Sequence, residues 1–198
     1  MELRALAVWM TRIDREEPEE IAVLLRRAVA GDASAFEKII MRFERRILML
    51  AWRLLGTAED AQDASQEVFL RAYKYLHRFD SGRQFEPWLV RMTVNVCRDL
   101  GRKRQRYPNV AIEAETLQAT GDPHSELSSE EQRQMVHAAL AELPEKERAA
   151  VVLRDIEGFS TAEVAEILGS SEVTVRSQIS SARVKIKKAI ERKKRGRI

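Results

Sequence analysis

The feature that most constrains the fold is a helical spacing of apolar residues, sustained over most of the chain. Within one long segment, apolar side chains recur every three or four residues: Phe36, Ile40, Phe43, Ile47, Leu50 and Leu54. An amphipathic helix buries such a stripe, whereas a strand requires sustained alternation every two residues, which no segment of this chain shows. Only 8 glycines and 5 prolines occur in 198 residues, and most lie between periodic segments. The sequence predicts an all-α fold and excludes a β-sandwich, a collagen or a disulfide scaffold.

Capping residues and glycines place the expected helices. In the first half we expect helices over 18–30, 33–55, 57–77 and 87–101. In the second half we expect them over 130–141, 144–157, 160–168 and from 171 into the C-terminal tail.

The periodic pattern stops between positions 107 and 129. This stretch holds Glu113, Glu115, Asp122 and Glu126 but no lysine or arginine. Such composition is typical of a flexible linker. We therefore predict two small helical domains, over 18–106 and 130–198, that are joined by an acidic linker and preceded by an extension over 1–17.

Positive charge is concentrated at the end of each predicted domain, although the formal net charge is only +3. The first block contains Arg98, Arg102, Lys103, Arg104 and Arg106. The second block covers positions 183–197 and holds nine lysines or arginines against one glutamate. Solvated helix ends would explain either block alone, but two such blocks favour nucleic acid as a ligand.

Aromatic residues accompany the cations of the first domain. Rings can stack on the bases of an unpaired strand while cations hold its phosphates. Trp88, Phe69 and Tyr73 have the spacing of core residues, so we expect them to be buried. Phe79 and Phe85, near the predicted loop at 79–82, are the better candidates for base contacts.

Residues 160–183 read STAEVAEILGSSEVTVRSQISSAR and predict a helix-turn-helix. Ser160 and Glu163 form a capping-box pattern, Gly169 permits the turn, and Ser171 can cap the second helix. The alternative is an ordinary helical hairpin. Donor-rich side chains on the second helix favour DNA reading in a major groove; they are Thr174, Arg176, Ser177, Gln178 and Ser181.

No catalytic set is apparent. The three histidines show no metal-binding spacing, and the single cysteine, Cys97, falls on the inner side of a helix. No apolar run reaches the roughly 18 residues that a membrane helix needs. We expect a cytoplasmic protein that is not an enzyme, inserts into no membrane and uses no metal or other cofactor.

Three stretches together resemble the sigma-70 family, in particular its extracytoplasmic-function (ECF) type. They are AEDAQDASQEVFLRAYKYL over 58–76, FEPWLVRMTVNVCRDLGRKRQR over 85–106, and the helix-turn-helix over 160–183. The resemblance implies a bacterial initiation factor that binds core RNA polymerase through its clamp coiled coil and flap. It implies a region 2 domain over 18–106 and a region 4 domain over 130–198, which read the −10 and −35 promoter elements.

The resemblance also assigns roles to individual residues. Asp63, Gln66 and Glu67 match polar contacts to the polymerase. The loop Phe79–Glu86 matches the site where a flipped −10 base is captured. The implied −10 contacts are Phe79, Phe85, Asn95, Arg98, Arg102 and Arg104. A buried, satisfied side chain is the alternative for Asn95.

In the second domain, Arg176 and Ser177 match −35 readers and Arg183 matches a phosphate contact. The family commonly carries Gly-Thr-Val-(Lys/Arg)-Ser-Arg where positions 173–178 read VTVRSQ, and an arginine where Ser181 stands. These departures imply an altered −35 sequence or a weaker affinity.

Two other classes stay open. A helix-turn-helix regulator would bind operator DNA as a dimer without polymerase, but it has no need of the 63–73 helix. An enzyme acting on nucleic acid would need a metal or nucleophile cluster. The resemblance also implies an anti-sigma partner for the exposed apolar and acidic faces.

Overall fold

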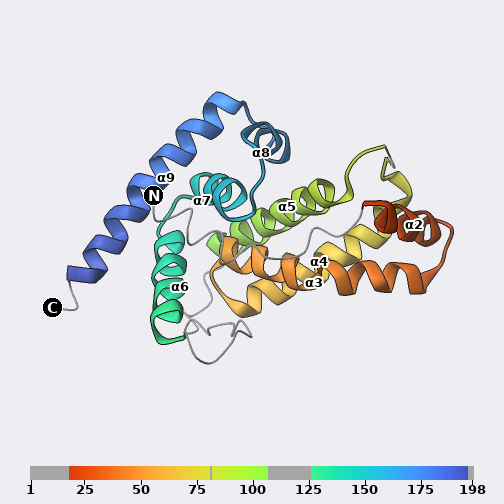
Figure 1. The fold of residues 1–198 in the computed structure, drawn as a ribbon, viewed down its shortest axis with the longest axis horizontal. Helices are drawn as coiled ribbons and strands as arrows, with labels where there is room; N and C mark the ends of the chain where they lie inside the picture. Colours follow the sequence, from red (N-terminus) through yellow and green to blue (C-terminus); the bar gives the residue numbers. More distant parts are fainter. Residues whose placement is uncertain (1–17, 81, 107–125, 196–198) are drawn as a thin grey trace.

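The structure, a computed structural model, describes residues 18–80, 82–106 and 126–195. These residues form helices and no strand, which confirms the all-α prediction. The first domain contains α2 (Pro18–Val29), α3 (Ala33–Leu55), α4 (Ala58–Tyr75), the 3₁₀ turn η1 (Leu76–Arg78) and α5 (Phe85–Arg106). The second contains α6 (Glu126–Ala141), α7 (Glu145–Val151), the π-helical turn η3 (Val152–Ile156), α8 (Thr161–Leu168) and α9 (Glu172–Arg195). Figure 1 shows the two groups of helices side by side.

Two predicted segments lie wholly or largely outside the described residues. The extension over 1–17 is one, and the linker over 107–129 is the other. Helix α6 begins at Glu126, within the predicted linker and four residues before the expected start at 130.

The first domain is built on the packing of α3 against α4. Gly56 takes the left-handed conformation, with φ 91°, that ends α3, and the Thr57 hydroxyl accepts a hydrogen bond from the Asp60 amide to begin α4. Buried alanines at 61, 64 and 72 let the two helices approach closely, while Val68 fills the seam. The resulting antiparallel pair leaves the opposite face of α4 exposed.

The second domain departs from prediction between positions 144 and 157, where one helix was expected. Helix α7 ends at Val151, and the chain continues through a π-helical turn in which the Glu157 amide donates to the Val152 carbonyl over 2.9 Å. The extra residue in this turn shifts the helix register. Gly158, with φ 80°, then redirects the chain toward α8.

The predicted helix-turn-helix is confirmed. Ser160 and Glu163 form the reciprocal capping box, and Gly169 has φ 61°. The Ser171 hydroxyl accepts from the Thr174 amide over 3.2 Å at the start of α9. Val175 and Ile179 are buried against α8, so the opposite face of α9 is free to meet a ligand.

The two domains are packed on each other. Leu50 of α3 and Val90 and Val94 of α5 lie in the same buried cluster as the core of α6–α9. In Figure 1, α5 runs from the first domain toward α7 and α8. The two domains therefore share a buried core. We call this packed arrangement the closed form.

Candidate protein and nucleic-acid interfaces

The outward face of α4 carries a stripe of four side chains spaced three or four residues apart. Asp63 and Gln66, both predicted site residues, are exposed at its N-terminal end. Leu70 and Tyr73 continue it and are 68% and 58% exposed. The stripe therefore exposes two large apolar side chains beside a carboxylate and an amide. Such a combination on one helix face is typical of a protein-binding surface. We call Asp63, Gln66, Leu70 and Tyr73 the α4 stripe.

Sequence reasoning missed half of this stripe. Tyr73 was expected in the core, but it is exposed and packs one side of its ring against Phe36 in a T-shaped contact, at a centroid distance of 5.0 Å. The signal that could have revealed Leu70 is its spacing of four from Gln66. Glu67 lies to one side, and its carboxylate accepts from Arg71 over 2.6 Å. This bond, together with Asp99, raises the pKa of Arg71.

The predicted −10 loop brings its aromatic residues together, although not all of them are exposed. Phe85 is the first residue of α5 and is only 4% exposed, so the expectation of a loop ring free to meet a base is wrong. Its ring contacts those of Phe43, Phe79 and Trp88 at centroid distances of 5.4–5.5 Å. Phe79 is half-buried at the edge of this cluster and stays accessible.

Of the polar −10 candidates on α5, two are exposed to solvent and two are bonded to carboxylates of other helices. Asn95 is exposed, which excludes the buried alternative, and Arg102 is exposed as well. The Arg98 guanidinium donates to Glu145 of α7 over 2.9 Å. Arg104 is ion-paired with Asp60 of α4. The pairing of Arg98 crosses the domain interface, whereas that of Arg104 does not.

Three of the predicted −35 residues lie on exposed positions of α9. Arg176 and Ser177 are exposed, and Arg176 is held by Glu172 one turn earlier, over 2.5 Å. Thr174 is exposed, and its hydroxyl lies 2.8 Å from that of Ser171 in the helix cap. Arg176 and Ser177 can therefore address a major groove directly.

The other three −35 candidates are engaged within the second domain. Gln178 is half-buried, and its Oε1 is buried without a hydrogen-bond partner. The Ser181 hydroxyl donates to Glu147 of α7 over 3.1 Å. Both were expected to be exposed readers, and this is wrong because both are half-buried and Ser181 is bonded to α7. Arg183 is half-exposed and makes two bonds of 2.8 and 2.6 Å to Asp155.

A buried ion-pair network joins the domains. Glu157, whose side chain is only 5% exposed, accepts from Arg53 over 2.7 Å and from Arg46 over 3.1 Å. Burial lowers the pKa of Arg53, while Glu157 opposes that effect. Arg46 also contacts Glu86 of α5 over 2.7 Å. Sequence patterns could not reveal this network, because Glu157 lies 104 positions from Arg53 and 111 from Arg46.

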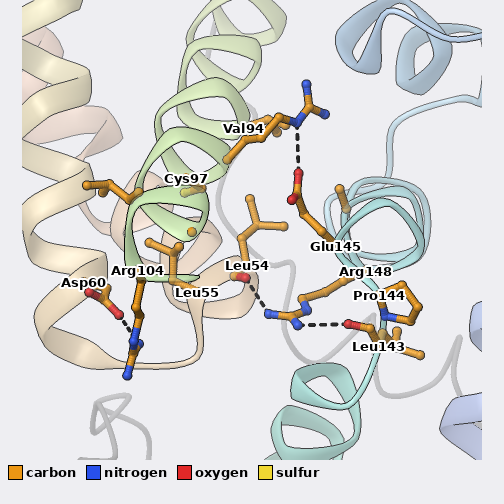
Figure 2. A pocket seen from close by; sticks show the side chains of 14 residues that line it. Leu54, Leu55, Asp60, Val94, Cys97, Arg104, Leu143, Pro144, Glu145 and Arg148 are labelled. Atoms are coloured by element: carbon orange, nitrogen blue, oxygen red, sulfur yellow. Dashed lines mark hydrogen bonds and ion pairs between the residues drawn. The ribbon is translucent and has the colours of Figure 1, made fainter. Parts of the chain in front are cut away.

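A cavity of about 250 Å³ lies beside this interface. Figure 2 shows Arg148 of α7 reaching across it, with bonds of 2.7 Å to the Leu54 carbonyl and 2.9 Å to the Leu143 carbonyl. These bonds satisfy carbonyls at the end of α3 and in the turn that follows α6. Cys97 lines the wall, and burial raises its pKa to about 12. A thiol held in its neutral form is a poor nucleophile, which supports the predicted core role of Cys97.

A stacked ring pair completes the interface. The His137 ring of α6 lies parallel to the Trp52 ring of α3, with centroids 3.7 Å apart and planes 6° apart. Burial lowers the pKa of His137, and the positive charges of Arg148, Arg53 and Lys193 lower it further, against a hydrogen bond with the Trp52 backbone. His137 is therefore neutral in the closed form at pH 7.

The closed form should weaken in mild acid. The pKa of His137 is lower in the folded chain than its ordinary value of about 6.5, so protonation opposes folding once the pH falls below that value. We expect the melting temperature to fall between pH 7.5 and 5.5 by more in the wild type than in His137→Phe. That variant keeps a ring against Trp52 but cannot titrate. Equal falls in the two proteins would contradict the role of His137.

No helix in the described parts of the chain is both long and apolar enough to span a membrane. The described surface instead offers the α4 stripe, the aromatic and basic groups of α5, and the outer face of α9. A helix-turn-helix domain joined to a helical domain with these surfaces defines a two-domain, DNA-binding transcription factor.

Comparison with known proteins identifies the family. The models for sigma-70 region 2 and sigma-70 region 4 match residues 39–107 and 133–186. RNA polymerase sigma-H factor of Pseudomonas aeruginosa is 32% identical over 87% of this chain and 95% of its own. ECF RNA polymerase sigma-E factor of Escherichia coli K12 is 34% identical over 85% of this chain and 93% of its own. The chain belongs to the sigma-70 family, as an RNA polymerase sigma factor of the ECF subfamily.

Solved structures share the fold. CnrH, determined in complex with the cytosolic domain of CnrY, is 27% identical, with a TM-score of 0.64 over 87% of this chain and 97% of that one. The sigma factor RpoE of Bartonella quintana, determined with the anti-sigma factor NepR, is 24% identical with a TM-score of 0.64 over 79% and 96% of the two chains. The all-α, two-domain architecture is therefore that of sigma factors. The role of the chain is in transcription initiation at promoters.

Proposed function

We propose that the chain binds core RNA polymerase through the α4 stripe, reads −10 DNA with α5 and the 79–86 loop, and reads −35 DNA with α9. The domains that carry these roles are 18–106 and 130–198. The observation that carries the proposal is the α4 stripe, because an isolated DNA-binding regulator has no use for exposed Leu70 and Tyr73 beside Asp63 and Gln66.

The polymerase contact combines two kinds of interaction. Leu70 and Tyr73 can bury apolar area against a partner helix, such as the clamp coiled coil. Asp63 and Gln66 add polar contacts at one end of the same stripe and fix its orientation. Glu67 has a supporting role, since its carboxylate already holds Arg71.

At the −10 element, Asn95 and Arg102 are available to an unpaired strand. An extruded base loses a few kcal/mol of stacking and pairing, and stacking on a ring can offset part of that loss. Phe79 is the ring accessible for this contact. The buried Phe85 ring packs against it and holds it in place. Arg98 becomes available for a phosphate only when it leaves Glu145.

At the −35 element, Arg176 and Ser177 make the base contacts, and Thr174 lies beside them at the start of the helix. Arginine is the side chain best suited to guanine, through O6 and N7 in the major groove. The exposed lysines and arginines further along α9 supply phosphate contacts that do not depend on sequence.

The closed form cannot occupy both elements together. Arg83 of the −10 loop lies 3.6 Å from Glu166 of α8, so the two reading surfaces are close neighbours. The names −35 and −10 place the elements about 25 base pairs apart, or about 85 Å along the DNA at 3.4 Å per base pair. The domains therefore part before promoter binding, breaking the bonds of Glu157 and freeing Arg98.

Three general properties of the protein follow from the same proposal. The chain positions polymerase on promoter DNA and catalyses no covalent step of its own. It needs no metal or other cofactor for this role. It acts in the cytoplasm, where bacterial polymerase and promoters meet. An anti-sigma protein is its regulatory partner; this is supported by the solved structures of similar fold, each of which holds a second protein.

The proposal is tested by mixing the full chain with bacterial core RNA polymerase and separating the complex by gel filtration. We expect the chain to co-elute with the enzyme, and an Asp63→Arg/Gln66→Ala variant to elute alone. A chain that fails to co-elute and binds duplex DNA as a dimer would instead establish the operator-binding regulator.

A further inference from the structure

We propose that Val173 is a specificity-determining residue, which recognises a thymine of the −35 element through the C5-methyl group of that base. The proposal rests on the proposed function of α9 and deepens it. Val173 follows Glu172, the first residue of the helix, and its side chain is 73% exposed, more than that of any other exposed large apolar residue in the described chain.

Val173 lies at the centre of the face of α9 that points away from the domain. Positions 173, 177, 180 and 184 follow one another at steps of four, three and four, and all four are exposed. The opposite stripe is buried and contains Val175, Ile179, Ala182, Ile186 and Ala189. A major groove that receives this helix therefore faces Val173 directly.

The neighbours of Val173 identify its ligand as DNA rather than lipid or another apolar surface. One turn further along lie Arg176 and Ser177, both exposed. A cation and a hydroxyl one turn from a valine suit the edge of a base pair, where polar atoms surround one methyl group. The thymine C5-methyl is the apolar group that the major groove displays, and the N-terminal residues of a recognition helix are those that reach base edges.

The loss of other readers increases the weight of this contact. Gln178 has a buried Oε1, and the Ser181 hydroxyl is bonded to Glu147 of α7, so these two side chains leave few direct contacts to the bases. The remaining exposed polar side chains between Val173 and Ser180 are Thr174, Arg176, Ser177 and Ser180, and the Thr174 hydroxyl is held in the helix cap by Ser171. With Ser177 beside them, Arg176 and Val173 favour a guanine and a thymine close together. Three residues rise about 4.5 Å, so the two bases lie within about two base pairs.

The test uses duplexes that the protein itself selects. A library with a randomised −35 segment is enriched with the full chain bound to core polymerase. Each thymine of the selected motif is then replaced singly by deoxyuridine, which pairs alike but lacks the methyl group. Binding is measured for the wild type, Val173→Ala and Val184→Ala at one salt concentration. Val184 is the matched control, because it is 51% exposed on the same face but about 16 Å further along the helix.

We expect one deoxyuridine position to weaken wild-type binding about fourfold, the effect of one lost methyl contact. Val173→Ala should weaken binding to the thymine duplex similarly and should not respond to deoxyuridine there, while Val184→Ala should respond as the wild type does. Equal responses of wild type and Val173→Ala at every thymine would overturn the inference, as would a selected motif without thymine near the guanine that depends on Arg176. Both results leave the sigma-factor function intact, whereas failure to enrich any motif would overturn that function and this inference with it.

Discussion

Replacing Leu70 by aspartate is expected to reduce binding to core RNA polymerase by at least 100-fold. The side chain lies in the middle of the α4 stripe and is 68% exposed, so the change should not disturb the fold. Burying a carboxylate in an apolar contact removes the area contributed by leucine and adds an unpaired charge, and the few hot-spot residues near the centre of an interface contribute about 2 kcal/mol or more each. The measurement is a titration of labelled chain with core enzyme.

Met41→Asp is the matched control for this variant. Met41 is 71% exposed on α3, outside the α4 stripe, and its substitution likewise replaces an exposed apolar side chain by aspartate. We expect Met41→Asp to bind polymerase within about twofold of the wild type, with both variants equally helical. Equal affinities of the Leu70 and Met41 variants would remove the α4 stripe from the polymerase contact.

Replacing Glu157 by alanine is expected to open the closed form. Glu157 neutralises Arg53, which is 7% exposed, and Arg46, and no other described acidic group is bonded to Arg53. Removing one partner of a buried ion pair destabilises the contact by about 3–5 kcal/mol, because a charge is left buried and uncompensated. The radius of gyration from small-angle scattering should rise, while the helix content is retained.

The control is Glu142→Ala, which removes an exposed ion pair with Arg192. Exposed pairs contribute about 0–1 kcal/mol, so this variant should stay as compact as the wild type. Glu157→Gln keeps a hydrogen-bond acceptor without the charge and should open the chain to an intermediate degree. A Glu157→Ala protein with the wild-type radius would show that the network does not hold the domains together.

Local signals were sufficient for much of the fold. The caps at Thr57 and Ser160 and the turn at Gly169 are encoded within four residues of sequence, and the structure contains each of them. The helical spacing of apolar residues likewise predicts a helix over 33–55, which is α3 in the structure. These features depend on neighbours in sequence, so a pattern can reveal them.

The predictions were wrong where tertiary packing decides the outcome. Gln178 and Ser181 look like exposed readers on a helix, but both are half-buried, and Ser181 is bonded to Glu147 of α7. Phe85 looks like a loop residue because Pro87 follows it, but α5 begins two residues before that proline, and the ring joins the aromatic cluster. The closed interface around Glu157 was not predicted at all, because it depends on how two independent domains meet.

The most direct test of the central claim is run-off transcription. Core polymerase, the full chain and DNA fragments carrying the selected −35 motif are combined, and transcript starts are mapped. Initiation is expected at fixed starts downstream of that motif, only when the chain is present, with strong losses for Leu70→Asp and Arg176→Ala. Starts that are unchanged when the chain is omitted, or chain-dependent repression without any new start, would contradict the claim that this protein is an initiation factor.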